Sequence, residues 1–254
     1  LPPHDRGNNL HGGPDGFDRR VWDVLDHGTD HLLLELVSPD GDQGFPGTVT
    51  ARVRFEVDGD TLRTTCTART DAPTLVSMTS HTYLNLEGEA AGSIDDHLLT
   101  VHADHYTPTD ATSIPLGDHA DVGGTPFDLR TPARVGAVVR HDHEQLLLAR
   151  GVDHNYVVRG SGMRELARLT GGGLELSLRS DQPGLQVYTG NFLDGTQRGT
   201  SGGLYRQGAG IALEPQHFPD SPHHPEWPST VLRPGEDYRT VTELAVTSGA
   251  ARTP

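Results

Sequence analysis

Four polar side chains of the 254-residue sequence have the chemistry for acid/base catalysis or ligand binding. His81 lies between TLVSMTS and TYLNL, Asp153 lies in GVDHNY, Gln186 in QPGLQVYTG and Glu214 in GIALEPQHFPD. Each also has an ordinary interpretation: a neutral core histidine, a turn-stabilising aspartate, an outward-facing amide and a solvated strand end. Glu214 alternatively is a partly desolvated base with a raised pKa. Taken singly, the ordinary interpretations are favoured, and spacing alone does not bring the four together.

Fifteen histidines raise the question of a metal site. The closest pairs are His141 with His143 and His223 with His224, but adjacent loop histidines do not easily bind one ion. Neither HExxH nor a cysteine-containing site occurs, so we expect exposed loop histidines and no metal. The GGxxG at 12–16 lacks the Lys–Ser/Thr of a phosphate loop, and no GxSxG elbow is present. We therefore expect no cofactor.

Charge and cysteine content limit the partners and the compartment. The formal net charge of −15 argues against nucleic acid and an anionic membrane surface, whereas a neutral, hydroxyl-rich ligand feels no such repulsion. The single cysteine, Cys66, excludes an intramolecular disulfide and fits a buried structural thiol in a reducing compartment. No apolar run of membrane-spanning length and no signal peptide is found, so a cytoplasmic protein is expected.

The elements that must position these side chains are expected to be short β-strands. Residues 48–69, TVTARVRFEVDGDTLRTTCTAR, alternate apolar and polar side chains on both sides of Asp58–Gly59, which predicts a hairpin. Further strands are predicted at 31–38, 74–86, 97–103, 155–159, 173–180, 185–190, 210–216 and 239–247, and only 136–150 suits a short helix. This pattern predicts an all-β antiparallel sandwich or barrel, in one domain over 1–254.

Seven stretches, taken as a set, resemble the aldose 1-epimerase (galactose mutarotase) family. They are NNLHGGPDGFDRRVW (8–22), SHTYLNLEG (80–88), IDDHLLTVHADHYTPTD with IPLGDHADVGGTPFDLR (94–130), GVDHNYVV (151–158), QPGLQVYTGNFLDG (182–195), ALEPQHFPDSPHHPEWPS (212–229) and VLRPGEDYRTVTE (231–243). They occur in family order and cover nearly the whole chain. One such stretch alone would be weak evidence for the family, whereas seven stretches in family order are strong evidence.

The resemblance implies a large antiparallel β-sandwich with a sugar cleft on one sheet face. It implies Glu214 as general base and His81 as general acid. It also implies that His11 hydrogen-bonds the sugar near its ring oxygen, and that Asp153 and Gln186 bind sugar hydroxyls.

Three further residues lie beside these motifs, and the resemblance gives them only a role in lining the site. They are Asn9, Tyr83 and His154.

The family chemistry suits these residue types. Interconverting α and β anomers requires removing the proton of the C1 hydroxyl while protonating the ring oxygen, rotation about C1–C2 in the open aldehyde, and reclosure. One base and one acid on either side of C1, both titrating near neutral pH, perform this without metal, redox step or covalent intermediate. Two alternatives stay open: a hexose-6-phosphate 1-epimerase, which needs a basic cluster for the phosphate, and a non-catalytic sugar-binding module. A glycosidase, which works with two carboxylates, is less favoured.

The sequence departs from the family at its start. The family normally carries several strands ahead of LHGG, ending in an Asn–Arg segment whose arginine reaches into the sugar site. Here only LPPHDRG precedes Asn8, and Arg6 does not match that segment. We expect these strands and their arginine to be missing from the 254 residues, which would expose a sheet edge.

Overall fold

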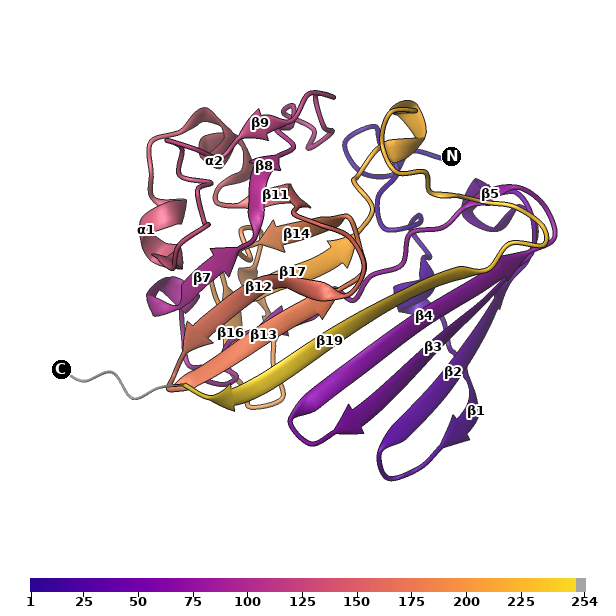
Figure 1. The fold of residues 1–254 in the computed structure, drawn as a ribbon, viewed down its shortest axis with the longest axis horizontal. Helices are drawn as coiled ribbons and strands as arrows, with labels where there is room; N and C mark the ends of the chain where they lie inside the picture. The colour runs from indigo at the N-terminus through magenta and orange to yellow at the C-terminus, as the bar shows by residue number, and fades with distance from the viewer. Residues whose placement is uncertain (250–254) are drawn as a thin grey trace. The chain divides into compact units, whose positions relative to one another are not determined.

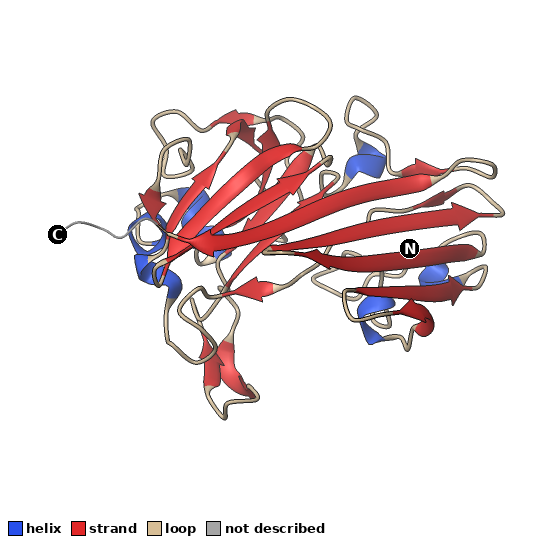
Figure 2. Cartoon of the chain, turned by 60° about the horizontal axis from the view of Figure 1, so that its bottom comes forward, coloured by secondary structure: helices blue, strands red, loops and turns tan. Residues whose placement is uncertain are grey.

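Strands are the main regular secondary structure of the computed structural model, which describes residues 1–249 (Figures 1 and 2). The chain divides into two compact units: residues 1–78 with 221–243, and residues 79–220 with the chain from Leu244. The helices are short: α1 (Val135–Val139), α2 (Glu144–Ala149), and 3-10 turns at Phe17–Arg19, Asp42–Gly44, Ile94–Asp96 and Ser221–His223. Within residues 1–249, no helix is long and apolar enough to cross a membrane.

The first unit contains an antiparallel meander of four strands (Figure 1). They are β1 (Asp23–His27), β2 (His31–Ser38), β3 (Val49–Asp58) and β4 (Thr61–Thr70). The predicted hairpin is confirmed, since β3 pairs with β4 along its length, with Asp58 opposite Thr61. The two loop residues are Gly59–Asp60 rather than Asp58–Gly59, and the glycine takes the left-handed φ of 56°.

A small core belongs to this first unit. It consists of Val49, Ala51, Ala68, Val76 and Leu232, with Phe17, Trp22, Met78 and Tyr238 packed against it. Leu232 belongs to β18 (Val231–Leu232), Val76 directly follows the paired strand β5 (Thr74–Leu75), and Tyr238 begins β19 (Tyr238–Ser248). The thiol of Cys66 is buried in β4, as the alternation predicts.

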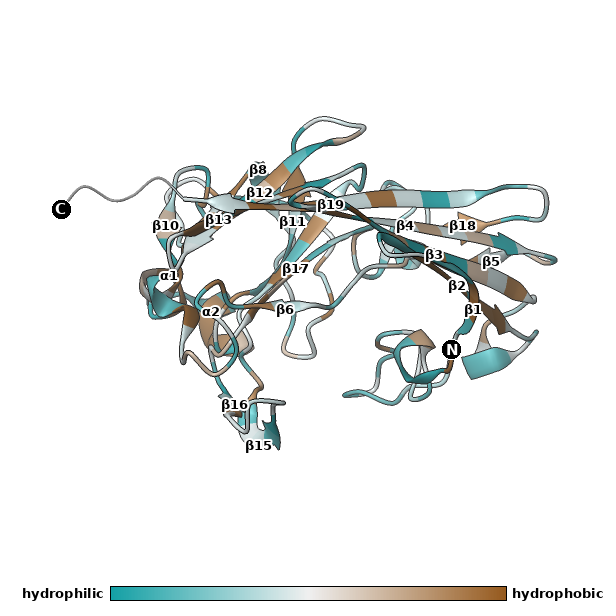
Figure 3. Ribbon diagram, turned by 90° about the horizontal axis from the view of Figure 1, so that it is seen from below, coloured by the Kyte–Doolittle hydropathy of each residue, from teal (hydrophilic) through white to brown (hydrophobic). Residues whose placement is uncertain are grey.

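The second unit is an antiparallel β-sandwich. One sheet has the order β6–β17–β14–β11–β8–β9, and the other runs from the part of β19 that begins at Leu244 through β13–β12–β7–β10. The bounds of the first are β6 (Tyr83–Leu84), β17 (Ile211–Gln216), β14 (Gly184–Tyr188), β11 (Asp153–Val158), β8 (Ala103–Tyr106) and β9 (Ala120–Asp121). Those of the second are β13 (Leu174–Ser180), β12 (Arg164–Gly171), β7 (Leu98–Val101) and β10 (Ala133–Arg134). A separate hairpin, β15 (Asp194–Arg198) with β16 (Leu204–Arg206), is mainly hydrophilic (Figure 3).

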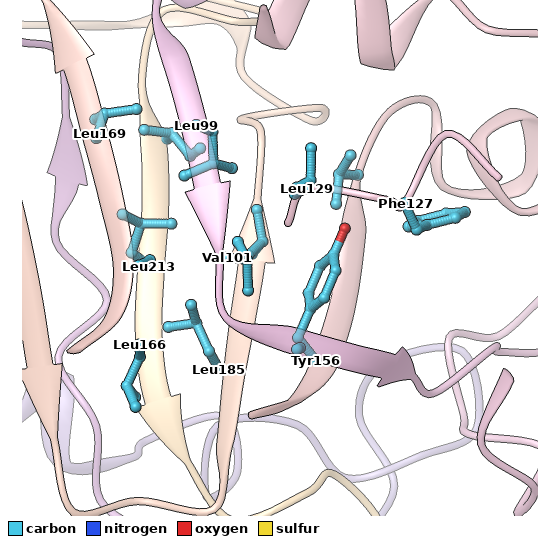
Figure 4. Close-up of a cluster of buried hydrophobic side chains, with 14 of the residues drawn as sticks. Leu99, Val101, Phe127, Leu129, Tyr156, Leu166, Leu169, Leu185 and Leu213 are labelled. Carbon is cyan, nitrogen blue, oxygen red and sulfur yellow. The ribbon is translucent and has the colours of Figure 1, made fainter. Parts of the chain in front are cut away.

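Both sheets of the second unit supply one buried apolar cluster (Figure 4). Leu99 and Leu166 come from β7 and β12, and Tyr156, Leu185 and Leu213 come from β11, β14 and β17. Each of the last three has one polar neighbour in its strand, Asn155, Gln186 or Glu214, and this neighbour points to the face opposite the core. The predicted all-β sandwich is confirmed.

One predicted strand is wrong. Residues 74–86 form only β5 and β6, with an irregular segment between them. The division between the two units falls at Met78 and Thr79, so this segment leaves the first unit and enters the second. Predictions of a single domain over 1–254, and of missing strands ahead of LHGG, stay predictions.

Candidate active site

Strand register gathers four of the predicted residues on one face of the second unit's six-stranded sheet. Gln186 of β14 lies opposite Glu214 of β17 and opposite Asn155 of β11. Residues directly opposite each other in antiparallel neighbours point to the same face. Leu213 pairs with Val187 on the other face, within the core.

His81 continues this series of directly opposite residues beyond Glu214. Strand β6 pairs with β17 through Tyr83 opposite Ala212. Continued two residues outward, the same register brings His81, which precedes the strand, opposite Glu214. Its Nε2 atom lies 3.6 Å from Oε1 of Glu214. His81 is therefore no core histidine: a third of its side chain is exposed.

The carboxyl group of Glu214 is in an unusual environment for an acid. The residue is 6% exposed and lies inside the apolar strand β17. Burial, and to a lesser extent the negative charge of Asp153, raise the pKa of Glu214 to about 8. Both causes disfavour the carboxylate, so the group exchanges its proton near neutral pH instead of staying ionised.

Asp153 and Gln186 are joined by a hydrogen bond. The Nε2 amide of Gln186 donates to Oδ1 of Asp153 over 2.8 Å. Asp153 begins β11 and lies opposite Tyr188 of β14, so its carboxylate shares the face that carries Glu214. The ordinary interpretations of an isolated turn aspartate and an outward-facing amide do not describe this pair.

Two tyrosines complete the cluster. The ring of His81 lies 5.0 Å from that of Tyr83, tilted by 32°, and meets the ring of Tyr188 edge-on at 5.9 Å. Burial, followed by Tyr188 and the Glu214 and Asp153 charges, raises the pKa of Tyr83 to about 12, so its hydroxyl stays protonated. The hydroxyl of Tyr188 accepts the Phe192 backbone N–H at 2.8 Å. These rings hold the His81 imidazole beside Glu214.

Sequence reasoning missed Tyr188 and Asn155, although a signal was present. Tyr188 follows Gln186 by two residues, and Asn155 follows Asp153 by two residues. Because side chains two apart on a strand share a face, both belong to the site face. Asn155 is 1% exposed, and in the described part of the chain neither of its amide atoms has a hydrogen-bond partner.

His154, which was expected to line the site, does not do so. It alternates with Asp153 and Asn155 along β11 and is 1% exposed. Its ring meets that of Phe127 at 4.7 Å, in the core of the sandwich. The one-residue offset from Asp153 turns it to the opposite face.

His11 and Asn9 belong to the first unit. His11 adopts a left-handed φ of 52° and is followed by Gly12 and Gly13, which are left-handed as well. A Cβ on Gly13 would lie 2.6 Å from Oε1 of Gln43, so this turn needs a glycine there. The side-chain amide of Asn9 donates to the carbonyl of Pro2 over 3.1 Å. The parts of His11 and Asn9 in sugar binding stay predictions.

The histidine pairs have local structural contacts. His143 caps α2, its Nδ1 accepting the Gln145 N–H at 3.2 Å, and His224 stacks on Trp227 with ring centres 4.0 Å apart. Among residues 1–249, no group of three His, Cys, Asp or Glu side chains is arranged to hold a metal ion.

The cluster combines a titratable carboxyl group, an imidazole, a second carboxylate and an amide on one face of a β-sandwich. Its imidazole and its buried carboxyl group lie close enough to reach two oxygens bonded to the same carbon. Such a site suits reversible proton transfer on a neutral, hydroxyl-rich ligand. The fold and the cluster together define the class as an all-β protein with a candidate acid/base site.

Comparisons with known proteins identify the family. The sequence model of the aldose 1-epimerase family matches residues 1–245. Human galactose mutarotase is 41% identical over 240 residues, covering 92% of this chain and 68% of that protein. Aldose 1-epimerase from Escherichia coli K12 is 40% identical over 251 residues, 96% of this chain and 71% of that protein. The chain belongs to the aldose 1-epimerase family.

Solved structures agree with this assignment. The GalM/aldose epimerase homologue from C. elegans has a TM-score of 0.90 at 27% identity, covering 98% of this chain and 75% of that one. Galactose 1-epimerase from Lactobacillus acidophilus NCFM has a TM-score of 0.86 at 30% identity, covering 98% and 73%. The predicted family and its galactose mutarotase fold are thus confirmed.

Proposed function

We propose that this protein is an aldose 1-epimerase, which interconverts the α and β anomers of aldohexoses such as glucose and galactose. The observation that carries the proposal is the pairing of Glu214, whose pKa is raised to about 8, with His81 at 3.6 Å, in a chain of this family. A carboxyl group that ionises in this range can take up and release a proton in each turnover.

In this mechanism Glu214 is the base and His81 is the acid. The Glu214 carboxylate removes the proton of the C1 hydroxyl while the His81 imidazolium protonates the ring oxygen, and the bond from C1 to the ring oxygen breaks. Both oxygens are bonded to C1, so an acid and a base 3.6 Å apart can serve them together. After rotation about C1–C2, the ring oxygen attacks the aldehyde carbon, His81 recovers its proton from that oxygen, and Glu214 returns its own to O1.

The remaining predicted residues act as sugar ligands in this proposal. Asp153 and Gln186, already joined to each other, bind ring hydroxyls, and the Asp153 charge also raises the pKa of Glu214, which makes its carboxylate a stronger base. His11 hydrogen-bonds the sugar near its ring oxygen, and Asn9 lines the site. We propose a neutral aldose as the only ligand, with no nucleic acid partner, and a cytoplasmic location.

The site chemistry favours this function over the alternatives. A sugar phosphate needs cations, whereas the cluster offers the carboxyl groups of Glu214 and Asp153. A purely binding module has no use for a buried carboxyl group beside an imidazole, since such burial costs free energy whenever the carboxylate forms.

Polarimetry tests the proposal. Fresh α-D-glucose and α-D-galactose lose their excess optical rotation spontaneously, and we expect catalytic amounts of the protein to accelerate this decay. Glu56→Gln is a matched control for Glu214→Gln: it changes a half-buried glutamate of β3 and should keep the full rate. Sugar binding by calorimetry without any acceleration would instead identify a binding module and overturn the proposal.

A further inference from the structure

We infer that His154, locked by Gln145, is a positioning residue that holds Asp153 in its ligand-binding geometry from behind the sheet. The inference rests on the role proposed for Asp153 as a sugar ligand. It assigns a part in catalysis to a buried histidine that touches neither substrate nor acid nor base.

The first link joins the histidine ring to the strand backbone at Asp153. The Asp153 N–H donates to Nδ1 of His154 over 3.1 Å. Because Nδ1 accepts, the ring carries its proton on Nε2. Burial, helped by His143, lowers the pKa of His154 to about 3, so the ring stays neutral and keeps this acceptor at physiological pH.

The second link fixes the other side of the ring. Nε2 of His154 lies 3.0 Å from Oε1 of Gln145, to which it donates. The orientation of that amide is set independently: its Nε2 donates to the Thr109 carbonyl at 2.9 Å, and its Oε1 accepts the Thr109 N–H at 2.8 Å. The Thr109 backbone groups thus fix which amide atom of Gln145 is the oxygen. That oxygen can only accept a hydrogen bond from the histidine, so Gln145 selects the tautomer that carries its proton on Nε2 and leaves Nδ1 to accept the Asp153 N–H.

Packing prevents the ring from turning away. His154 is 1% exposed, and Gln145 is 8% exposed. The ring meets Phe127 at 4.7 Å and Tyr106 at 5.8 Å, both nearly edge-on. An apolar side chain would fill such a position at lower desolvation cost. The main effect of the hydrogen-bonded series of Asp153, His154 and Gln145 is therefore to fix one geometry, and its contribution to stability is smaller.

Asp153 is consequently held from two sides. Its carboxylate accepts the Gln186 amide on the site face, and its N–H donates to His154 on the core face. The preceding residue is anchored too, since the Val152 N–H donates to Oγ1 of Thr189 over 3.0 Å. A small rotation of the first peptide of β11 would move the carboxylate away from the sugar hydroxyls, and misplacement of this kind is costly in catalysis.

Three variants test the inference. His154→Leu removes both links, whereas His154→Asn keeps a short side chain that offers an acceptor to the Asp153 N–H. The control is His97→Leu: His97 is also fully buried, and its Nε2 accepts the Leu86 backbone N–H at 3.0 Å, but it has no link to Asp153 in the described residues. Melting temperature and circular dichroism identify the folded proteins to be compared.

We expect His154→Leu to raise KM for galactose about 10-fold or more, His154→Asn to recover most of this loss, and His97→Leu to lower only stability. A double-mutant cycle is sharper still. In an Asp153→Ala background, His154→Leu should change kcat/KM less than about 2-fold, because its target is gone. Additive losses, or a folded His154→Leu protein with wild-type KM, would overturn the inference.

A readout without turnover separates this inference from the proposed function. In the wild-type protein, ¹⁵N NMR of the His154 ring should show the proton on Nε2, and the Asp153 amide should be protected from hydrogen exchange. His154→Leu should abolish that protection, and a wild-type exchange rate in this variant would contradict the inference even if the protein catalysed nothing. An inactive wild type with the expected tautomer and protection would count against the proposed function only.

Discussion

Nε2 of His81 lies 3.6 Å from Oε1 of Glu214, the separation that the register between β6 and β17 sets. The histidine precedes its strand and keeps a third of its side chain exposed, while the glutamate is buried in the middle of its own strand. An accessible imidazole beside a desolvated carboxyl group gives two proton carriers with different environments at one point of the sheet. The predictions below follow from this arrangement.

The first prediction concerns the pH dependence of catalysis. Glu214 must be ionised to act as a base and His81 protonated to act as an acid, so kcat/KM should follow a bell-shaped pH profile in which the Glu214 pKa of about 8 sets one limb. Asp153→Asn removes one of the two causes of the raised pKa, and the midpoint of that limb should shift to lower pH. Rates of anomer exchange from pH 5 to 9.5 measure both midpoints, and identical midpoints in the two proteins would argue against the coupling.

The second prediction concerns stability. The folded protein holds the Glu214 proton more tightly than the unfolded chain, whose carboxyl pKa is near 4.5, so stability falls as pH rises from 4.5 through about 8. Glu214→Gln removes this penalty and should raise the free energy of unfolding at pH 9 by about 2–4 kcal/mol. At pH 4 the two proteins should unfold alike. Urea titrations at both pH values provide the check, and equal stability at pH 9 would show that the carboxyl group is not desolvated.

The third prediction concerns Tyr83, whose ring lies against His81 at 5.0 Å. Tyr83→Phe keeps the ring and should change kcat/KM by less than about 3-fold, whereas Tyr83→Ala frees the imidazole and should lower it about 10-fold or more. Steady-state kinetics with galactose distinguish the two. A large loss in Tyr83→Phe would mean that the hydroxyl, not the ring, is the functional part.

The fourth prediction concerns substrate charge. The carboxyl groups of Glu214 and Asp153 repel an anionic sugar, and we expect kcat/KM for glucose 6-phosphate to be at least about 10-fold below that for glucose. The gap should narrow in Asp153→Asn. Comparable rates with both sugars in the wild-type protein would instead favour the hexose-6-phosphate alternative.

The hairpin of residues 49–70 shows what local sequence pattern can predict. Its alternation and central glycine identify both strands, although the turn is displaced by one residue. The two-residue periodicity of a strand would also have predicted that Tyr188 shares a face with Gln186, and Asn155 with Asp153. The same rule puts His154 on the opposite face, which the motif comparison alone overlooked.

Local sequence pattern does not predict which strands pair when they are far apart in the sequence. Gln186 meets Glu214 and Asn155 because β14 lies between β17 and β11, and no local signal specifies that order. The resemblance to the family brought these side chains together in the prediction, because the site residues of a family reflect how its strands pair. The irregular approach to His81 was missed for another reason: the apolar run at 74–86 looks like a strand, but it crosses the division between two units.

The central claim is that Glu214 and His81 exchange protons with the C1 hydroxyl and the ring oxygen of an aldose. Its most direct test is magnetisation-transfer NMR of glucose at anomeric equilibrium, which measures α/β exchange with wild-type, Glu214→Gln and His81→Asn proteins. We predict rapid exchange with the wild type and a loss of about 10²-fold or more in each variant, with sugar binding retained. Wild-type exchange rates in a correctly folded Glu214→Gln protein would contradict the account.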